Sequence, residues 1–259
     1  GSSELQWLCR RHHRALLIEH SPLRPLTSTT SSGGELPLEA VLAGDLAMKC
    51  WRPTFNHDAI VQLCRELRAP SSQSAWAPTP WGRTLPRSCV GTDPSSYLSS
   101  LALLRTPAVQ ELDRLFFEPA TALLSKTFSR PMVALRLANG QVLPGWALRE
   151  MGSGEGIPFH CEQDWNRVNL IENGTLMETD FEPNFQMSFL YSVETASSGG
   201  ELQISGQDDL VTLNAGELLL FNAGCHRHQI RRTGGSCQRV VLGGFLRLNL
   251  NHTSLHCYV

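Results

Sequence analysis

Apolar and polar residues follow two different periods along this chain, and the change comes near residue 130. Before it, apolar residues recur at helical spacing in several stretches, as on one face of an α-helix. Segments rich in Ser, Thr and Pro separate these stretches and indicate loops. We therefore predict helices at 4–20, 59–67, 95–104 and 107–128, and loops at 21–34 and 71–94.

After residue 130, short apolar runs alternate with turn signals such as Asn139-Gly140 and Thr233-Gly234-Gly235. Many short strands with regularly spaced turns indicate a jelly roll or barrel. Strands are predicted at 132–137, 142–151, 157–162, 168–172, 186–193, 201–204, 210–213, 218–222, 227–231 and 238–248. The predicted fold is mainly β: a cupin-like double-stranded β-helix over 131–259, with helices of 1–130 packed against it in a single compact domain.

Two motifs in the β region carry candidate metal chemistry. In His160-Cys161-Glu162, the first and third side chains would point to one face of a strand, while Cys161 faces away. His228 delivers a second imidazole from a separate predicted strand. Two His and one carboxylate on one face of a metal form the facial triad of non-heme Fe(II) oxygenases. We therefore predict His160, Glu162 and His228 as metal ligands.

Both the distal His and the carboxylate have a competitor nearby. His226 would share a strand face with His228, but His228 fits the spacing to Arg239 better. Asp164 competes with Glu162, although its side chain would start about 7 Å further along the strand. His226, Asp164 and Trp165 are then candidates for substrate contacts. The simpler interpretations place His226 at the surface and Asp164 at the start of a turn.

The charge and the cysteine spacing indicate which partners the protein can have and in which cellular compartment it works. The formal net charge is −2, with no strong run of either sign, whereas nucleic-acid binding usually needs a basic patch. No apolar segment approaches a membrane span and no signal peptide is visible. The eight Cys have irregular spacing and no Cys-x-x-Cys pair. We expect a cytoplasmic protein with reduced thiols, no nucleic-acid partner and no membrane; the oligomeric state stays open.

Over roughly residues 130–250, these motifs resemble the Fe(II)/2-oxoglutarate-dependent dioxygenases of the double-stranded β-helix fold. The resemblance rests on His160-Cys161-Glu162, His228, the run Ser198-Gly199-Gly200-Glu201-Leu202, and Arg239, whose guanidinium can bind a carboxylate bidentately. The string Leu220-Phe221-Asn222-Ala223-Gly224 resembles more specifically bacterial small-molecule hydroxylases related to the carrier-independent halogenases of indole-alkaloid biosynthesis.

The resemblance implies an oxygenase that uses Fe(II), 2-oxoglutarate and O2 to hydroxylate, or otherwise oxidise, an unactivated C–H bond of a small-molecule or natural-product substrate. Succinate and CO2 would be released, and ascorbate would stimulate the reaction. Arg239 would hold the distal carboxylate of 2-oxoglutarate, with Arg149 and Tyr191 as further candidate contacts. Arg149 could equally form a surface salt bridge, and Tyr191 could be a core aromatic.

The carboxylate of Glu162 separates this chain from the halogenases that it resembles, because those enzymes have a small residue at that position. The resemblance therefore implies hydroxylation or another oxidation, not halogenation. Two alternative functions stay open from the sequence. One is a non-catalytic, cupin-like module that binds a small molecule or metal without turnover. The other is a hydroxylase of peptide or amino-acid residues.

Overall fold

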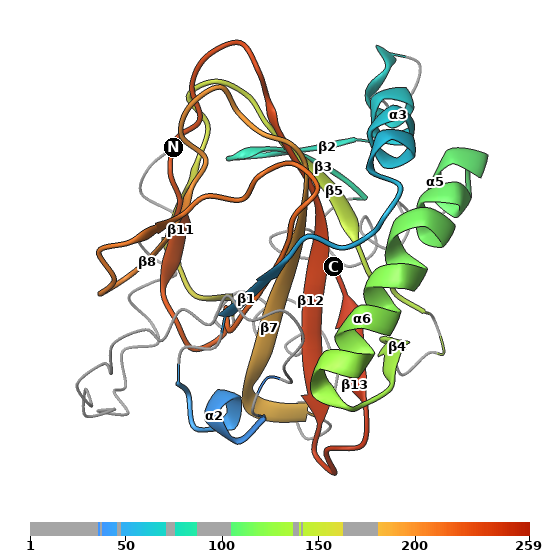
Figure 1. Cartoon of the computed structure of the whole chain (residues 1–259), viewed down its shortest axis with the longest axis vertical. Helices are drawn as coiled ribbons and strands as arrows, with labels where there is room; N and C mark the ends of the chain where they lie inside the picture. Colours follow the sequence, from blue (N-terminus) through green and yellow to red (C-terminus); the bar gives the residue numbers. More distant parts are fainter. Residues whose placement is uncertain are drawn as a thin grey trace.

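The computed structural model describes residues 36, 38–45, 48–70, 76–86, 105–136, 140, 142–162 and 181–259. In this part of the chain, two β-sheets face each other, and helices cover one side of the larger sheet (Figure 1). The helices are α2 (Leu38–Leu42), α3 (His57–Arg68), α5 (Pro107–Leu112), the π-helical η3 (Asp113–Phe117) and α6 (Glu118–Phe128). The strands are β1 (Met48–Trp51), β2 (Ala77–Thr79), β3 (Gly82–Leu85), β4 (Met132–Ala134), β5 (Ala147–Met151), β6 (Ile157–His160), β7 (Phe181–Glu194), β8 (Leu202–Ile204), β9 (Leu210–Val211), β10 (Leu218–Phe221), β11 (His228–Ile230), β12 (Arg239–Asn249) and β13 (Leu255–Tyr258).

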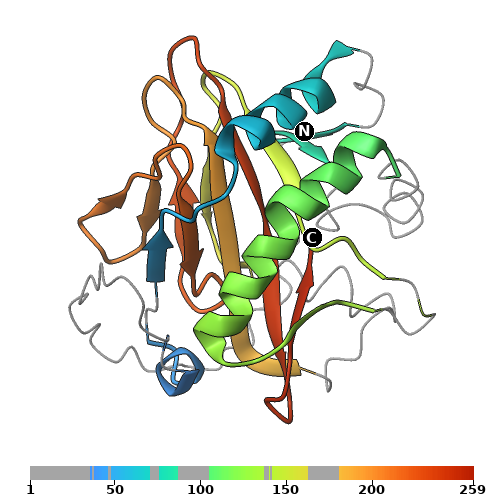
Figure 2. The same cartoon turned by 45° about the vertical axis from the view of Figure 1, so that its right-hand side comes forward.

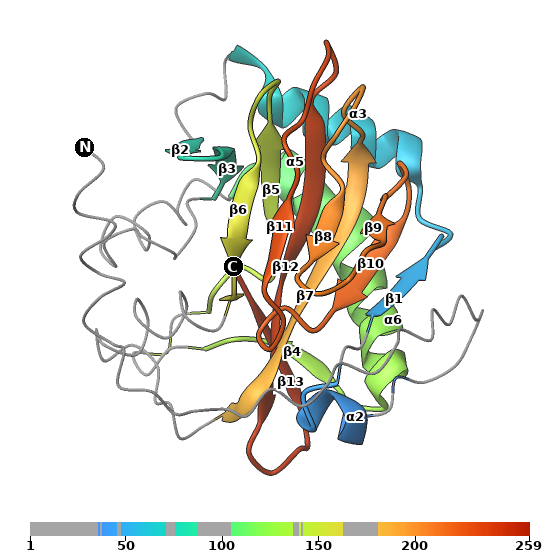
Figure 3. The same cartoon turned by 90° about the vertical axis from the view of Figure 1, so that its left-hand side faces the viewer.

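Strands β5 to β12 pass back and forth between the two sheets, as Figure 3 shows. The larger sheet has the order β1-β10-β7-β12-β5-β3-β2, with β13 and β4 beside β12, and the smaller sheet has the order β6-β11-β8-β9. All pairings among β5 to β12 are antiparallel. This alternation is the strand order of a jelly roll, or double-stranded β-helix, and the predicted fold class is confirmed.

The strands of the larger sheet serve two cores, because successive side chains point to opposite faces. One face packs against the helices and forms the outer core, where Phe116 and Leu124 meet Leu242. The other face packs against the smaller sheet and forms the inner core, where Val241 meets Ile230. Figure 2 shows α5, η3 and α6 lying along the outer face of this sheet. The inner face is therefore the one that can present side chains to a site between the sheets.

The long helix predicted at 107–128 is confirmed, with a π-helical turn at its centre. Asp113–Phe117 forms this turn and ends two residues before Pro119, which cannot donate a backbone hydrogen bond. The wider turn accommodates the proline without ending the helix. The predicted helix at 59–67 corresponds to α3, where the Asn56 side chain accepts a hydrogen bond from the Ala59 amide at 3.2 Å. No described helix is long and apolar enough to cross a membrane.

The structure differs from the prediction mainly at strand ends and in one loop. The predicted loop at 71–94 contains the hairpin β2–β3, which adds to the larger sheet beside β5. Strand β6 ends at His160, so Glu162 lies outside the strand predicted at 157–162. Strand β11 begins at His228, so His226 does not share a strand face with it as expected. Strands β1 and β13 were not predicted. The predicted helices at 4–20 and 95–104 and the strand at 168–172 lie outside the described residues.

Candidate metal centre

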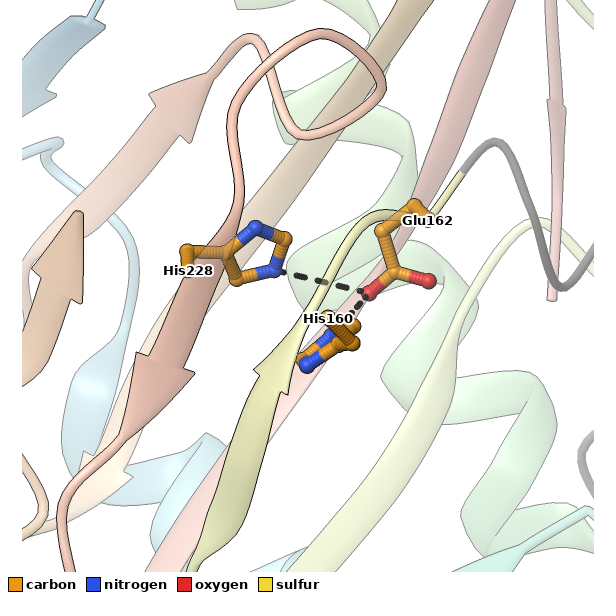
Figure 4. A group of neighbouring side chains, drawn as sticks. All are labelled: His160, Glu162 and His228. Atoms are coloured by element: carbon orange, nitrogen blue, oxygen red, sulfur yellow. Dashed lines mark hydrogen bonds and ion pairs between the residues drawn. The ribbon is translucent and has the colours of Figure 1, made fainter. Parts of the chain in front are cut away.

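His160, Glu162 and His228 converge at one end of the smaller sheet (Figure 4). His160 is the last residue of β6 and His228 the first of β11, and these residues are direct partners in the antiparallel pairing. Their ring centroids lie 4.3 Å apart. Glu162 Oε1 is 3.3 Å from His160 Nε2 and 3.8 Å from His228 Nε2. One ligand atom from each residue lies within 4.8 Å of the others, which is close enough to hold a single metal ion.

Glu162 lies two residues beyond the end of β6 and not in the strand, which corrects the geometry expected from its spacing. The Glu162 amide donates to the Ala223 carbonyl at 3.4 Å, so the backbone after β6 is bound to the backbone after β10. Cys161 directs its thiol to the Gly224 carbonyl of the same segment and takes no part in the three-ligand group. The carboxylate therefore depends on the 223–224 backbone for its position.

The second nitrogen of each imidazole is already committed to the backbone. His160 Nδ1 lies 2.7 Å from the Pro158 carbonyl, and His228 Nδ1 lies 2.8 Å from the His226 carbonyl. A carbonyl can only accept, so each Nδ1 carries the proton when the imidazole is neutral. Each Nε2 faces Glu162: it donates to the carboxylate when the imidazole is charged, and it presents its lone pair to a metal when the imidazole is neutral. This tautomer is the one that a metal-binding His requires, and second hydrogen bonds of this kind fix the ring orientation.

The electrostatics of Glu162 match a ligand that stays ionised. Burial by itself would raise the pKa of this carboxyl, but hydrogen bonds and charge interactions with His160 and His228 outweigh burial and lower the pKa to about 2. An anionic oxygen with two imidazole nitrogens is the donor set of the non-heme Fe(II) facial triad. The residues therefore fit a divalent metal such as Fe(II).

Arg239 lies on the inner face of β12, where it is only 9% exposed. Its Nη1 contacts Met151 Sδ at 3.7 Å, and no described carboxylate forms an ion pair with it. Burial, together with the nearby charge of Arg149, lowers the pKa of Arg239 to about 10. A buried cation without an anion is costly unless a ligand supplies the counter-charge. The inner face thus presents a guanidinium suited to an anionic ligand.

Arg149 lies on β5, on the inner face of the larger sheet, and is partly exposed. It stands opposite Val241 of the inner core, and its guanidinium lies 5.3 Å from the ring centroid of Phe245. Together with its influence on Arg239, this position puts a second positive charge on the inner face.

The structure corrects the co-substrate role considered for Tyr191. The side chain belongs to the outer core, packs against Phe55 and Phe116, and its hydroxyl lies 2.8 Å from His57 Nδ1. It therefore points away from the face that carries Arg239. The interpretation as a core aromatic is the one that fits.

The three candidate substrate contacts have different outcomes. His226 is buried but precedes β11, and it does not belong to the three-ligand group. Burial lowers the pKa of its imidazole, although hydrogen bonds to the backbone of Asp45 and Gly44 oppose the shift. Asp164 and Trp165 lie outside the described residues. Their predicted roles stay predictions.

Sequence reasoning missed the groups that hold the candidate ligands in place. The carbonyls of Pro158, His226 and Ala223 fix the two rings and the backbone of Glu162. Every residue has a carbonyl, so these contacts leave no signal in the sequence. Met151, which touches Arg239, could have been found by pairing the predicted strands at 142–151 and 238–248.

Comparisons with known proteins give similar folds at low identity. The sequence matches no protein-family model and no curated protein. A prolyl-4-hydroxylase from Pseudomonas putida is 16% identical with a TM-score of 0.43, over 82% of this chain and 98% of that chain. An N-substituted L-amino acid dioxygenase from Burkholderia ambifaria AMMD is 12% identical with a TM-score of 0.49, over 85% of this chain and 89% of that chain.

A third similar structure, a 2OG-Fe(II) oxygenase family oxidoreductase from Burkholderia pseudomallei, is 14% identical with a TM-score of 0.41, over 80% of this chain and 88% of that chain. At such identities and TM-scores, these likenesses establish neither family nor substrate for this chain.

Proposed function

We propose that this protein is an Fe(II)- and 2-oxoglutarate-dependent oxygenase that hydroxylates a C–H bond of a small-molecule substrate. One observation carries the proposal: a jelly roll holds both a His-Glu-His group and a buried guanidinium without an ion pair among the described residues. The first fits a divalent metal and the second fits the distal carboxylate of a co-substrate that chelates this metal. A metal-binding module without turnover would need only the first.

Each residue then has a defined task. His160 and His228 present Nε2 to the metal because their Nδ1 protons are donated to backbone carbonyls. Glu162 adds an anionic oxygen. Arg239 neutralises and orients the co-substrate through bidentate hydrogen bonds. When bound, Fe(II) and 2-oxoglutarate supply the oxidising power for C–H cleavage with O2, and 2-oxoglutarate becomes succinate and CO2. The protein contributes placement of the substrate against this centre.

The carboxylate of Glu162 favours hydroxylation, or a related oxidation, over halogenation. An anionic ligand both occupies the coordination position that a halide would need and repels the halide. We therefore expect products without halogen even at high chloride, which mass spectrometry of reactions with and without chloride would check. A chlorinated product from the wild-type protein would exclude Glu162 as a metal ligand.

Anaerobic titration tests the proposal directly. Protein loaded with Fe(II) should bind 2-oxoglutarate and discriminate against 2-oxopentanoate, which keeps the 2-oxo acid but lacks the distal carboxylate. Adding O2 and ascorbate should then yield succinate, even without substrate. Metal binding without any preference between the two acids would contradict the role of Arg239. Binding of both metal and 2-oxoglutarate without succinate would favour the non-catalytic binding module.

A further inference from the structure

A second polar pair lies on the inner face of the larger sheet, eight residues along β12 from Arg239. Alternation along β12 places Arg247 on the same face as Arg239, because its neighbour Leu246 belongs to the outer core. Gln186 on β7 shares the inner face with Leu190 by the same rule. The two residues are register partners, and Arg247 Nη1 donates to Gln186 Oε1 at 3.3 Å.

Both members of this pair keep donors without acceptors. Gln186 is fully buried, and neither its Nε2 nor Arg247 Nε has a hydrogen-bond partner among the described residues. No described carboxylate pairs with Arg247; its remaining contacts are the Glu182 carbonyl at 3.4 Å and the ring of Phe181, whose centroid is 5.7 Å away. The Glu182 carboxylate is instead 2.6 Å from His252. Buried donors left unpaired are costly, which points to a missing acceptor at this place.

The pair adjoins the backbone that positions Glu162. The Gly224 amide donates to the Gln186 carbonyl at 2.9 Å, and the neighbouring Ala223 carbonyl accepts from the Glu162 amide. A Cβ on Gly224 would lie only 2.7 Å from Gln186 Cβ, so the two segments are in close contact. A group bound by Arg247 and Gln186 would therefore stand beside the metal centre.

Aromatic residues accompany the pair on this face. Phe181 lies under the guanidinium of Arg247, and Phe245, two residues before Arg247, packs against Tyr258 with centroids 5.7 Å apart. Binding sites for small molecules combine largely apolar surroundings with a few well-placed polar groups. This arrangement suits a molecule with an apolar body and one anionic end.

We propose that Arg247 and Gln186 bind a carboxylate of the organic substrate, so that the substrate is a small organic acid with an apolar body. This inference deepens the proposed function and rests on it for the identity of the metal centre. A carboxylate offers two oxygens that accept from the guanidinium and the amide together. Arg239 does not compete for this group because the distal carboxylate of 2-oxoglutarate occupies it.

The test uses protein loaded with Mn(II) and N-oxalylglycine, which mimics 2-oxoglutarate and blocks Arg239. Ligand-observed NMR titrations compare 3-phenylpropanoate and phenylacetate with their primary amides. The wild-type protein should bind each acid about tenfold more tightly than its amide, because a charge-assisted pair is lost with the amide. Arg247→Gln should reduce this preference to near one, whereas Arg232→Gln, at an exposed arginine, should preserve it.

A second variant tests the same inference if Arg247→Gln does not fold. Gln186→Glu places a carboxylate opposite Arg247, so the protein should keep a folded NMR spectrum and lose its preference for acids. Equal binding of acids and amides by the wild-type protein, with Mn(II) and N-oxalylglycine bound, would overturn this inference and leave the oxygenase proposal standing. If the protein does not bind N-oxalylglycine but still prefers acids in a way that depends on Arg247, the oxygenase proposal would fail and the carboxylate site would stand.

Discussion

Arginines on the two sides of the larger sheet differ in their partners. On the outer side, Glu150 is 2.5 Å from Arg68 and 3.0 Å from Arg83, and Arg68 also reaches Glu194 at 2.6 Å. On the inner side, Arg239 and Arg247 have no ion pair with a described residue. The first group joins α3 and the β2–β3 hairpin to the sheet. The second group forms no such ion pair within the described residues, and its contacts there are to uncharged groups.

This difference separates charges that serve the fold from charges that serve a ligand. A buried cation whose hydrogen bonds are satisfied by carboxylates has no need of a further partner. A buried cation without such partners stays costly until an anion arrives, and then contributes to binding. We therefore expect changes on the outer side to alter stability, and changes on the inner side to alter binding and turnover.

The largest effect on the inner side should come from His228→Ala. Removing one of three ligands should weaken metal affinity by more than about 100-fold, since even losing an outer partner of a ligand costs 10–100-fold. Succinate formation should stop, while thermal unfolding shows a folded protein. Isothermal titration with Mn(II) measures the affinity. Gln229→Ala, which removes an outward side chain paired with Gln203, is the matched control on the same strand. Full activity of His228→Ala would show that His228 is not a metal ligand.

On the outer side, Glu150→Ala should lower the free energy of unfolding by about 3–5 kcal/mol, because it leaves two guanidiniums without their shared carboxylate. Urea denaturation measures this change. The folded fraction should still bind Mn(II) and 2-oxoglutarate with wild-type affinity. A loss of 2-oxoglutarate affinity without a loss of stability would show that the two sides are not separate.

Arg239→Ala should weaken co-substrate binding without lowering stability, the opposite of the effect expected for Glu150→Ala. Losing a bidentate, largely buried pair should cost about 2–5 kcal/mol of co-substrate binding, which raises the Michaelis constant for 2-oxoglutarate by on the order of 30-fold or more. The unfolding free energy should not fall, because no ion pair of the described protein is broken. Initial rates of succinate formation at varied 2-oxoglutarate provide the constant. If it is unchanged, Arg149 is the next residue to substitute.

The smallest effect should be a change in acid stability at Glu194. Partial burial raises the pKa of its carboxyl, but Arg68 and Arg65 outweigh burial and hold the pKa below its usual 4.5. A depressed pKa stabilises the fold above pH 4.5, and this contribution is lost as the pH falls through the lowered pKa. Glu194→Gln should therefore narrow the stability difference between pH 7 and pH 4 in urea denaturation. Asp209→Asn, at an exposed carboxylate, should leave that difference unchanged.

The jelly roll and its candidate ligands could be predicted because both depend on local patterns. Short apolar runs between turns mark strands, and the His160 and His228 motifs stand at the ends of two of them. The face to which each residue of β7 points could not be predicted, because all its residues from Phe185 to Val193 are buried. This ambiguity allowed Tyr191 to be considered for the wrong face.

The outer ion pairs and the β2–β3 hairpin had no such local signal. Arg68 and Glu150 stand on different elements, far apart in the sequence, so only the packing of α3 on the sheet brings them together. The hairpin strands are three and four residues long and lie in a segment rich in proline, where a loop was predicted. Their pairing depends on the neighbouring edge of β5.

The order of strands in the larger sheet also has a consequence for how the protein folds. Among the described strands, β1 pairs only with β10, and β5 pairs with β12 and β3, so most pairings join distant parts of the chain. Domains dominated by such non-local contacts fold slowly, because each loop must close before its contacts contribute. His160 and His228 meet through one of these late pairings, β6 with β11. Iron added during refolding should therefore be captured at the end of the process, and should not accelerate its early steps.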